Sequence, residues 1–421
     1  MKIRSALAAS FVLALAMPVA AQGEPSELVY FGQRLDGAES AIFGARFDPG
    51  SGKLTLLGPV AKVDRPTWVL PSPDRSVIFA ASETGNDGFT PGGLWSFAAD
   101  PVTGALHPLS RITSGGGGAT FLTINPRAPQ LFVANYGTGH VGLVPIMPGG
   151  RLMPPLSVVQ DQGSGPHKRQ KSAHAHGIAI DPTGQYALVS DLGADKVFVY
   201  RIDSKTQALT PNDPPSVAAK PGSGPRHIVF SADGRFVYVN SELTSELTTY
   251  AWDAARGALA PLQTISTRLA NAAGDNGAGE ILVSHDGRFL YASNRGDDSL
   301  VVYALDPASG LPREIQRTPA GGRTPWAISF DQTNRWLLVA NEGSGQIKVF
   351  AHDVATGLLS PTDHTLEVPH VSGIAVVAAQ FPDEGRTLGE GDMLILDPAH
   401  GALRVVGALA IDDWADPAIT G

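Results

Sequence analysis

The stretch Gly224-Pro225-Arg226-His227-Ile228-Val229-Phe230-Ser231-Ala232-Asp233-Gly234-Arg235-Phe236-Val237-Tyr238-Val239 reveals the fold, because similar stretches recur about every 50 residues. One apolar run leads into a tight Asp-Gly turn and a second apolar run leaves it, which is typical of a β-hairpin. Leu247–Trp252 and the residues after Gly257 add a third and a fourth strand. A four-stranded unit repeated at this period predicts a β-propeller.

Six copies of this unit are complete, and in each of them the second strand is followed by a polar residue. These second strands are predicted at Ser76–Ala81, Gln130–Ala134, Tyr186–Ser190, Phe236–Asn240, Phe289–Ser293 and Trp336–Ala340. The polar residues that close them are Ser82, Asn135, Asp191, Ser241, Asn294 and Asn341.

The seventh copy is divided between the two ends of the chain. Leu28–Phe31, Ala41–Phe47 and Lys53–Leu57 match a second, a third and a fourth strand, and Gly373–Ala378 matches the missing first strand. Joining both ends in one blade closes the ring without exposed strand edges. We therefore expect an all-β protein, a seven-bladed propeller of four-stranded antiparallel blades over residues 22–379.

The C-terminal residues 380–421 leave a second blade count open. Strands are expected at Asp392–Leu396 and Ala402–Leu409. These strands could belong to an eighth blade or to a C-terminal appendage, and the sequence does not distinguish the two.

The N-terminal residues 1–21 have the pattern of a secretory signal peptide. Lys2 and Arg4 precede the apolar run Ala6–Met17, and Val19-Ala20-Ala21 supplies small residues ahead of Gln22. This order of charge, apolar run and small residues predicts cleavage before Gln22. We expect an exported protein that is located in the periplasm.

Composition excludes several classes of partner. The chain has 31 Lys and Arg against 40 Asp and Glu, a net charge of -9 without any basic tract, which argues against nucleic acid and anionic membranes as partners. No segment after the signal peptide approaches 18 apolar residues, so no membrane insertion is expected after cleavage. The absence of cysteine excludes thiolate chemistry and Cys-based metal sites. The oligomeric state is left open.

Equivalent positions of different blades form rings around one axis, so residues far apart in sequence converge there. The residues equivalent to Arg226 are Thr67, Thr120, His176, Gly279 and Trp326. The residues that follow the closing polar groups are Glu83, Tyr136, Leu192, Glu242, Arg295 and Glu342. This variety of His, Arg, Glu and Tyr predicts a polar pocket at the mouth of the channel.

His174-Ala175-His176 is the sharpest local motif. Alternate residues of a strand point to one face, so both imidazoles could reach one ligand. A metal site would need a third ligand, such as His167 or His227. A substrate-contacting or catalytic histidine and a structural hydrogen-bonding pair are the other interpretations.

The charged residues of the rings also have two interpretations each. The planar guanidinium groups of Arg226 and Arg295 could bind a carboxylate, a phosphate or a developing oxyanion, or they could form ion pairs within the propeller. Glu242 and Glu280 lie on neighbouring blades, and one of them could have a raised pKa and act as general base. Pairing with Arg226 or Arg295 would instead make these carboxylates structural.

The chain resembles the family of seven-bladed propeller lactonases, which includes the bacterial propeller-type 6-phosphogluconolactonase and the fungal carboxy-muconate cyclase. The resemblance extends from about Leu28 to Val377 and rests on several motifs in order. These motifs are Ala134-Asn135-Tyr136-Gly137, Arg169-Gln170, His174-Ala175-His176, Ser190-Asp191-Leu192-Gly193-Ala194-Asp195, Gly224-Pro225-Arg226-His227, Glu242-Leu243, Gly279-Glu280-Ile281 and Ser293-Asn294-Arg295-Gly296.

The resemblance implies hydrolysis of a lactone, or its reverse closure, without a required metal or other cofactor. The catalytic residues that it implies are His176, Arg226, Glu242 and Arg295. The residues that we expect to bind the substrate are His174, His227, Glu280, Tyr136 and Asn294.

Three features depart from the family pattern. Trp326 stands where the family usually has arginine, which weakens the case for phosphate binding, and Ser241 stands where the family usually has asparagine. The expected export also conflicts with 6-phosphogluconolactone, which is made and used in the cytoplasm.

We therefore expect an exported hydrolase whose small-molecule substrate is an unphosphorylated sugar lactone or a related lactone. In this hypothesis Glu242 activates water, His176 assists proton transfer, and Arg226 with Arg295 stabilises the oxyanion or binds a substrate carboxylate. Exchanging Glu242 for glutamine is then expected to remove activity and to leave thermal unfolding nearly unchanged. The alternatives are a non-catalytic propeller that binds an anionic small molecule or a protein partner, and a metal-dependent hydrolase.

Overall fold

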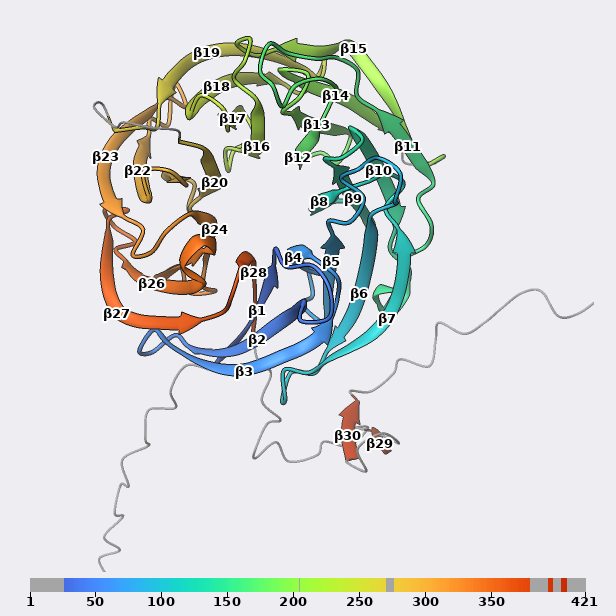
Figure 1. Cartoon of the computed structure of the whole chain (residues 1–421), viewed down its shortest axis with the longest axis vertical. Coiled ribbons are helices and arrows are strands. Elements are labelled where there is room, and N and C mark those ends of the chain that lie inside the picture. The colour runs from blue at the N-terminus through green and yellow to red at the C-terminus, as the bar shows by residue number, and fades with distance from the viewer. Residues whose placement is uncertain (1–25, 204, 270–275, 379–392, 397–402, 407–421) are drawn as a thin grey trace, which may run out of the picture. The chain divides into compact units, whose positions relative to one another are not determined.

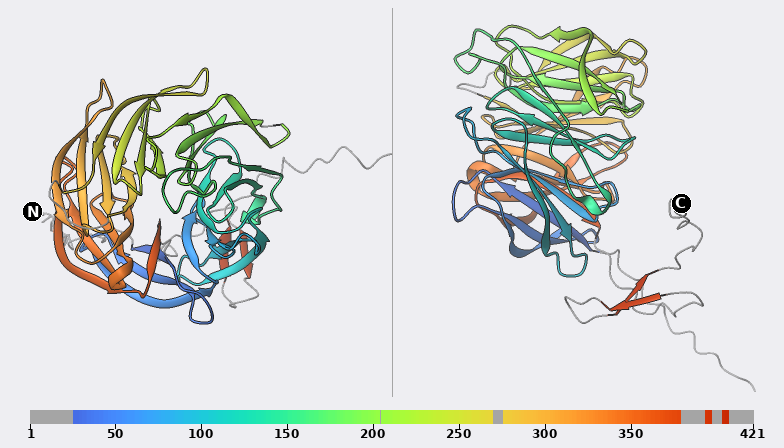
Figure 2. Two further views of the ribbon diagram at one scale, coloured as in Figure 1. Left: turned by 45° about the horizontal axis from the view of Figure 1, so that its top comes forward. Right: turned by 90° about the vertical axis from the view of Figure 1, so that its right-hand side faces the viewer.

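The computed structural model describes residues 26–203, 205–269, 276–378, 393–396 and 403–406, and within them seven four-stranded sheets form a ring of blades (Figure 1). The chain divides into two units, Met1–Ala379 and Gln380–Gly421, and the ring belongs to the first. In every blade the strands are antiparallel, and the first strand of each lies toward the centre of the ring (Figures 1 and 2). The predicted all-β, seven-bladed propeller is confirmed.

The first three blades follow the N-terminal part of the repeat in chain order. Blade one contains β4 (Pro66–Pro71), β5 (Val77–Ser82), β6 (Gly93–Ala99) and β7 (Leu106–Thr113). Blade two contains β8 (Ala119–Ile124), β9 (Gln130–Asn135), β10 (His140–Pro145) and β11 (Ser157–Gln160). Blade three contains β12 (Ala175–Ile180), β13 (Tyr186–Asp191), β14 (Lys196–Asp203) and β15 (Ala208–Ala218).

The next three blades repeat the same strand order. Blade four contains β16 (Pro225–Phe230), β17 (Phe236–Ser241), β18 (Glu246–Asp253) and β19 (Ala258–Ser266). Blade five contains β20 (Ala278–Val283), β21 (Phe289–Asn294), β22 (Ser299–Leu305) and β23 (Pro312–Pro319). Blade six contains β24 (Pro325–Phe330), β25 (Trp336–Asn341), β26 (Gln346–His352) and β27 (Leu359–Glu367).

Blade seven joins the two ends of the propeller. Its innermost strand is β28 (Val371–Ala378), which pairs antiparallel with β1 (Glu27–Gln33). The outer strands β2 (Ala41–Asp48) and β3 (Lys53–Lys62) complete the sheet. The expected closure of the ring by strands from both ends is thus observed.

Four further elements lie outside the blade pattern. Two single 3-10 turns, η1 (Pro148–Gly150) and η2 (Glu342–Ser344), follow strands of blades two and six. In the second unit, β29 (Met393–Leu396) and β30 (Leu403–Val406) form a separate two-stranded sheet. The predicted signal peptide, residues 1–21, lies outside the described residues. Where the structure describes the chain, it holds no helix long and apolar enough to cross a membrane.

The hydrophobic core lies between the blades. The second strands of six blades are buried at every residue, because each is packed between two neighbouring sheets. One apolar cluster, for example, joins Leu188 and Val199 of blade three to Ile228, Val239 and Trp252 of blade four. Burial of these side chains supplies most of the stability of such a fold, since the hydrophobic effect scales with the apolar area removed from water.

A β-bulge recurs at one position of the blades, where the first strand pairs with the end of the second. In blade four the bulge lies between Pro225 and His227, so that Arg226 is the extra residue. Bulges re-aim side chains and are common beside active sites. The residues at the bulges are Thr67, Thr120, His176, Arg226, Gly279 with Glu280, Trp326 and Ser372.

Glycines in the turns between third and fourth strands allow neighbouring blades to approach closely. Gly310 has a φ of +70°, and a Cβ atom there would lie 2.3 Å from the ring of Phe236 in blade four. The Tyr238 hydroxyl donates a hydrogen bond of 2.9 Å to the Gly310 carbonyl oxygen. This contact between blades therefore needs both the left-handed backbone and the missing side chain of glycine.

We expect Gly310→Ala to lower the free energy of unfolding by about 2–4 kcal/mol, because the methyl group adds a clash with Phe236 to the strain of the left-handed backbone. Gly149→Ala is the matched control, since Gly149 has a φ of +75° and a Cβ atom added there would meet no other atom within 4 Å. Urea denaturation measures both. Equal losses in the two variants would show that the contact with Phe236 is not tight.

Candidate active site

The polar rings predicted from the repeats meet at one mouth of the propeller. His176 in β12 and Arg226 in β16 are bulge residues, and Glu242 and Arg295 directly follow β17 and β21. The inner strands β12, β16, β20 and β24 follow one another around the centre of the ring in Figure 1. Residues that are up to 119 positions apart in sequence, such as His176 and Arg295, thereby reach one another.

Glu242 lies at the centre of this cluster and contacts three arginines. Its side chain is 5% exposed, and Oε2 lies 3.1 Å from Nε of Arg226 and 2.8 Å from Nη2 of Arg295. Its other oxygen, Oε1, accepts a hydrogen bond of 2.5 Å from Nη1 of Arg169. Nε2 of His176 lies 3.9 Å from Oε2. The structure thus shows the ion pairs that were the alternative interpretation of Glu242.

These guanidinium groups determine the charge of Glu242. Burial alone would raise the pKa of this carboxyl group, but Arg295, Arg226 and Arg169 together hold the pKa well below its ordinary value. The side chain is therefore an ionised carboxylate throughout the neutral range. A carboxylate held in this way binds protons weakly, which is unfavourable for a general base.

Arg226 is the most deeply buried charged group of the cluster. Its side chain is 1% exposed, and besides Glu242 it contacts the carbonyl oxygen of Gly279, to which it donates a hydrogen bond. Burial and the repulsion of Arg295 lower the pKa of Arg226 to about 10. The guanidinium group therefore remains charged at neutral pH, and it joins blade four to blade five.

His176 has an unused ring nitrogen. Its side chain is 8% exposed, its Nδ1 is buried without a hydrogen-bond partner among the described residues, and its ring lies edge-on to Tyr136 and His227. Burial, Arg226 and His227 lower the pKa of His176 well below its ordinary value, so the imidazole is neutral at pH 7. In the tautomer with its proton on Nε2, facing Glu242, Nδ1 presents a free lone pair.

His227 and Glu280 form a second pair behind this cluster. Nδ1 of His227 lies 2.6 Å from Oε1 of Glu280, and the His227 ring packs against Trp68 and Phe121. Burial raises the pKa of Glu280 to about 8, while burial and Arg226 lower the pKa of His227. At neutral pH the pair is therefore largely uncharged, with one proton between the carboxyl group and the imidazole.

The raised pKa of Glu280 makes stability depend on pH. The unfolded chain releases this proton at its ordinary pKa of 4.5, whereas the folded chain keeps it up to about 8. The stabilisation is complete below pH 4.5 and is lost as the pH rises, by about 1.4 kcal/mol per pKa unit between the two values. We expect Glu280→Gln to reduce this loss between pH 5 and 8, as measured by urea denaturation. If the free energy of unfolding changes with pH as steeply in Glu280→Gln as in the wild type, the raised pKa of Glu280 is contradicted.

The remaining predicted substrate-binding residues occupy two different surroundings. The rings of Tyr136 and His174 stack with centroids 4.7 Å apart, and the Tyr136 hydroxyl accepts a hydrogen bond of 2.8 Å from Nη2 of Arg169. Tyr136 and His174 thus lie beside the cluster. Asn294 is fully buried, and its side chain bonds to Thr267, so it ties the end of β21 in blade five to the connection that follows β19 of blade four.

Two arginines at this mouth were not among the predicted site residues. Arg169 lies between β11 and β12, outside the blade pattern, so no position in the repeat could reveal it. Arg34 follows Gln33, the polar residue that closes β1, and therefore occupies the same ring position as Glu242 and Arg295. Extending the alignment to the divided blade would have found Arg34.

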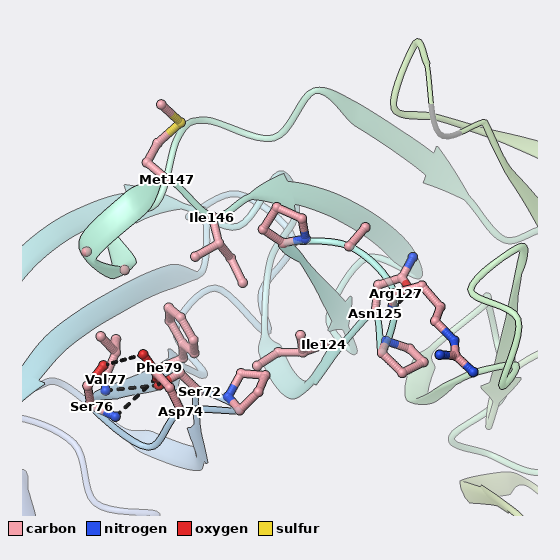
Figure 3. A pocket seen from close by; sticks show the side chains of 16 residues that line it. Ser72, Asp74, Ser76, Val77, Phe79, Ile124, Asn125, Arg127, Ile146 and Met147 are labelled. Carbon is pink, nitrogen blue, oxygen red and sulfur yellow. Dashed lines mark hydrogen bonds between the residues drawn. The ribbon is translucent and has the colours of Figure 1, made fainter. Parts of the chain in front are cut away.

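A metal centre and a surface pocket are two other kinds of site that could support chemistry. Among the described residues, no three His, Cys, Asp or Glu side chains gather as metal ligands. Figure 3 shows a pocket on the opposite face, between the β4–β5 and β8–β9 turns. Its Asp74 is hydrogen-bonded by Ser72 and Ser76, and its Arg127 donates to the carbonyl oxygen of Pro182. This pocket therefore offers no group poised for chemistry comparable to His176.

The fold and the cluster define a class of protein, a propeller hydrolase that places a neutral imidazole and several guanidinium groups around its axis. A family model described as "Lactonase, 7-bladed beta-propeller" matches residues 28–376. The chain belongs to this lactonase family, which confirms the recognition made from the sequence and identifies the protein as a lactonase.

Individual relatives cover most of the chain. A 6-phosphogluconolactonase of Bacillus subtilis is 30% identical over 305 residues, which are 72% of this chain and 85% of the relative. The structure of a periplasmic gluconolactonase of Pseudomonas aeruginosa has a TM-score of 0.79 and 37% identity, covering 84% of this chain and 100% of its own. A putative 6-phosphogluconolactonase of Bacteroides fragilis gives 0.76 and 29%, covering 84% and 98%.

Proposed function

We propose that the protein is an exported hydrolase of an unphosphorylated sugar lactone or a related lactone. The observation that carries this proposal is the neutral imidazole of His176, whose Nε2 lies 3.9 Å from Glu242 at the centre of the arginine cluster. Trp326 in place of the family's arginine and the similarity to a periplasmic gluconolactonase support an unphosphorylated substrate. The N-terminal sequence pattern supports export.

In the proposed reaction, the neutral imidazole of His176 takes a proton from water while the water oxygen bonds to the lactone carbonyl carbon. Arg295, which Glu242 holds at 2.8 Å, stabilises the oxyanion that forms, and Arg226 adds further positive charge. The ring C–O bond then breaks, and His176 returns the proton to the leaving oxygen. The product is the open hydroxy acid.

This proposal exchanges the roles that the sequence suggested for Glu242 and His176. Glu242 holds Arg226, Arg295 and Arg169 in place, and its negative charge stabilises the imidazolium that His176 becomes. The reason for the exchange is electrostatic, since three guanidinium groups weaken the carboxylate as a base. His176, by contrast, is neutral and has a free lone pair.

A panel of lactones, read with a pH indicator, tests the proposal. We expect acid release above the spontaneous rate from one or more unphosphorylated sugar lactones, and unchanged rates after dialysis against a chelator. Ligand binding by calorimetry without turnover across the panel would favour the non-catalytic alternative. Sequencing the N-terminus of the protein from a periplasmic extract tests export, with Gln22 expected as the first residue.

A further inference from the structure

Arg34 occupies a ring position beside the proposed site, on the blade that joins both ends of the propeller. It follows β1 directly, as Glu242 follows β17 and Arg295 follows β21. Its guanidinium carbon lies 4.0 Å from the centroid of the Trp326 ring, and that of Arg295 lies 4.3 Å from the same ring. The guanidinium carbon of Arg226 lies 5.4 Å from the same centroid, so one indole contacts two arginines of the cluster and one arginine outside it.

Arg34 differs from the other arginines on Trp326 in its partners. Arg295 contacts Glu242 at 2.8 Å, whereas the side chain of Arg34 forms no hydrogen bond and no ion pair with the described residues, and its Nε is buried. Burial and the repulsion of Arg65 and Arg295 lower the pKa of Arg34, and the attraction of Glu83 and Glu342 offsets this only in part. Keeping an unpaired guanidinium group partly out of water is costly, and a bound anion would remove that cost.

The charges around Arg34 indicate what kind of anion fits. The charged groups that act on Arg34 are Glu83, Glu342, Arg65 and Arg295. With Arg34 itself, three arginines face two carboxylates, which leaves a surplus of one formal positive charge around this side chain. A carboxylate carries one negative charge and neutralises this surplus, whereas a phosphate monoester with about -1.5 to -2 exceeds it.

We propose that Arg34 is a specificity-determining residue, which binds a carboxylate substituent of the lactone while the lactone carbonyl lies between His176 and Arg295. The inference rests on the proposed function and narrows its substrate to acidic sugar lactones. Trp326 holds the guanidinium group of Arg34 by a cation–π contact. The planar guanidinium group then forms two parallel hydrogen bonds with the carboxylate.

The test compares three lactones of one sugar: neutral gluconolactone, glucarolactone with a carboxylate at the far end, and 6-phosphogluconolactone. We expect the wild type to have its highest kcat/KM with glucarolactone. Arg34→Gln should lower the ratio of kcat/KM for glucarolactone over gluconolactone by about 10- to 100-fold, because a charge-assisted hydrogen bond is lost. Most of this change should be in KM. Arg34→Lys should recover part of the ratio.

Arg323→Gln is the control for net charge, since Arg323 is exposed and its Nη2 bonds to the carbonyl oxygen of Gly343. It should leave the ratio unchanged, and thermal unfolding checks that Arg34→Gln folds.

An unchanged ratio in Arg34→Gln, or a preference for the phosphorylated lactone, would overturn the inference while lactonase activity stands. If the wild type hydrolyses none of the three, the proposed function fails. In that case, calorimetry with glucarate tests the carboxylate site by itself. Binding to the wild type that is lost in Arg34→Gln supports this site, and absence of binding to the wild type overturns it.

Discussion

Glu242→Gln should reduce kcat/KM for lactone hydrolysis by about 100-fold or more and should also destabilise the protein by about 3–5 kcal/mol. The substitution removes the single carboxylate that contacts Arg169, Arg226 and Arg295, so three guanidinium groups lose their common partner. This differs from the expectation drawn from the sequence, in which thermal unfolding stayed nearly unchanged. Steady-state kinetics and urea denaturation measure the two effects.

Glu246→Gln is a matched control for the loss of one carboxylate in the same blade. Glu246 pairs with Lys220 at 2.7 Å, and the Lys220 side chain is largely exposed, so the pair contributes little. We expect wild-type activity and a change in stability below about 1 kcal/mol. Glu242→Gln with full stability would show that the arginine cluster does not depend on this carboxylate.

His176→Ala should reduce kcat by about 100- to 10,000-fold while stability changes far less than in Glu242→Gln. Its Nε2 lies 3.9 Å from Glu242, beyond hydrogen-bond distance, and its Nδ1 has no hydrogen-bond partner among the described residues, so the variant breaks no hydrogen bond of the imidazole. His364→Ala on β27, the outermost strand of blade six, is the control for loss of an imidazole. Comparable kcat in His176→Ala and the wild type would remove His176 from the mechanism.

The pH profile of the wild type gives a second view of His176. Burial and Arg226 lower its pKa well below 6.5, and protonation removes the lone pair that accepts the proton from water. We expect kcat/KM to hold between pH 7 and 6.5 and to fall only at lower pH. An acid limb centred above pH 6.5 would contradict this assignment.

The blades could be predicted from the sequence because their pattern is local and repeated. Apolar runs of fixed length around Asp-Gly turns located the second strands, and the polar residues Ser82, Asn135 and Asp191 are indeed the last residues of β5, β9 and β13. The same alignment brought His176 and Glu242 to one mouth. Equivalent positions in a ring of blades are neighbours around the axis, whatever their separation in sequence.

The electrostatics of the site could not be predicted in the same way. The pKa of Glu242 depends on three arginines from separate parts of the chain, and one of them, Arg169, lies on a connection without a repeat. Arg34 was missed because the divided blade was left out of the rings. The bulge that aims Arg226 at Glu242 is a backbone irregularity, which no pattern of apolar residues shows.

The decisive measurement is the initial rate of acid release from unphosphorylated sugar lactones, neutral and acidic, by wild type and His176→Ala. We predict a wild-type kcat/KM within the usual enzymatic range of about 10⁴–10⁸ M⁻¹s⁻¹ for at least one lactone, and a loss of at least about 100-fold in kcat for the variant. A wild-type rate equal to spontaneous hydrolysis would refute lactone hydrolysis, and equal rates in both proteins would refute catalysis by His176.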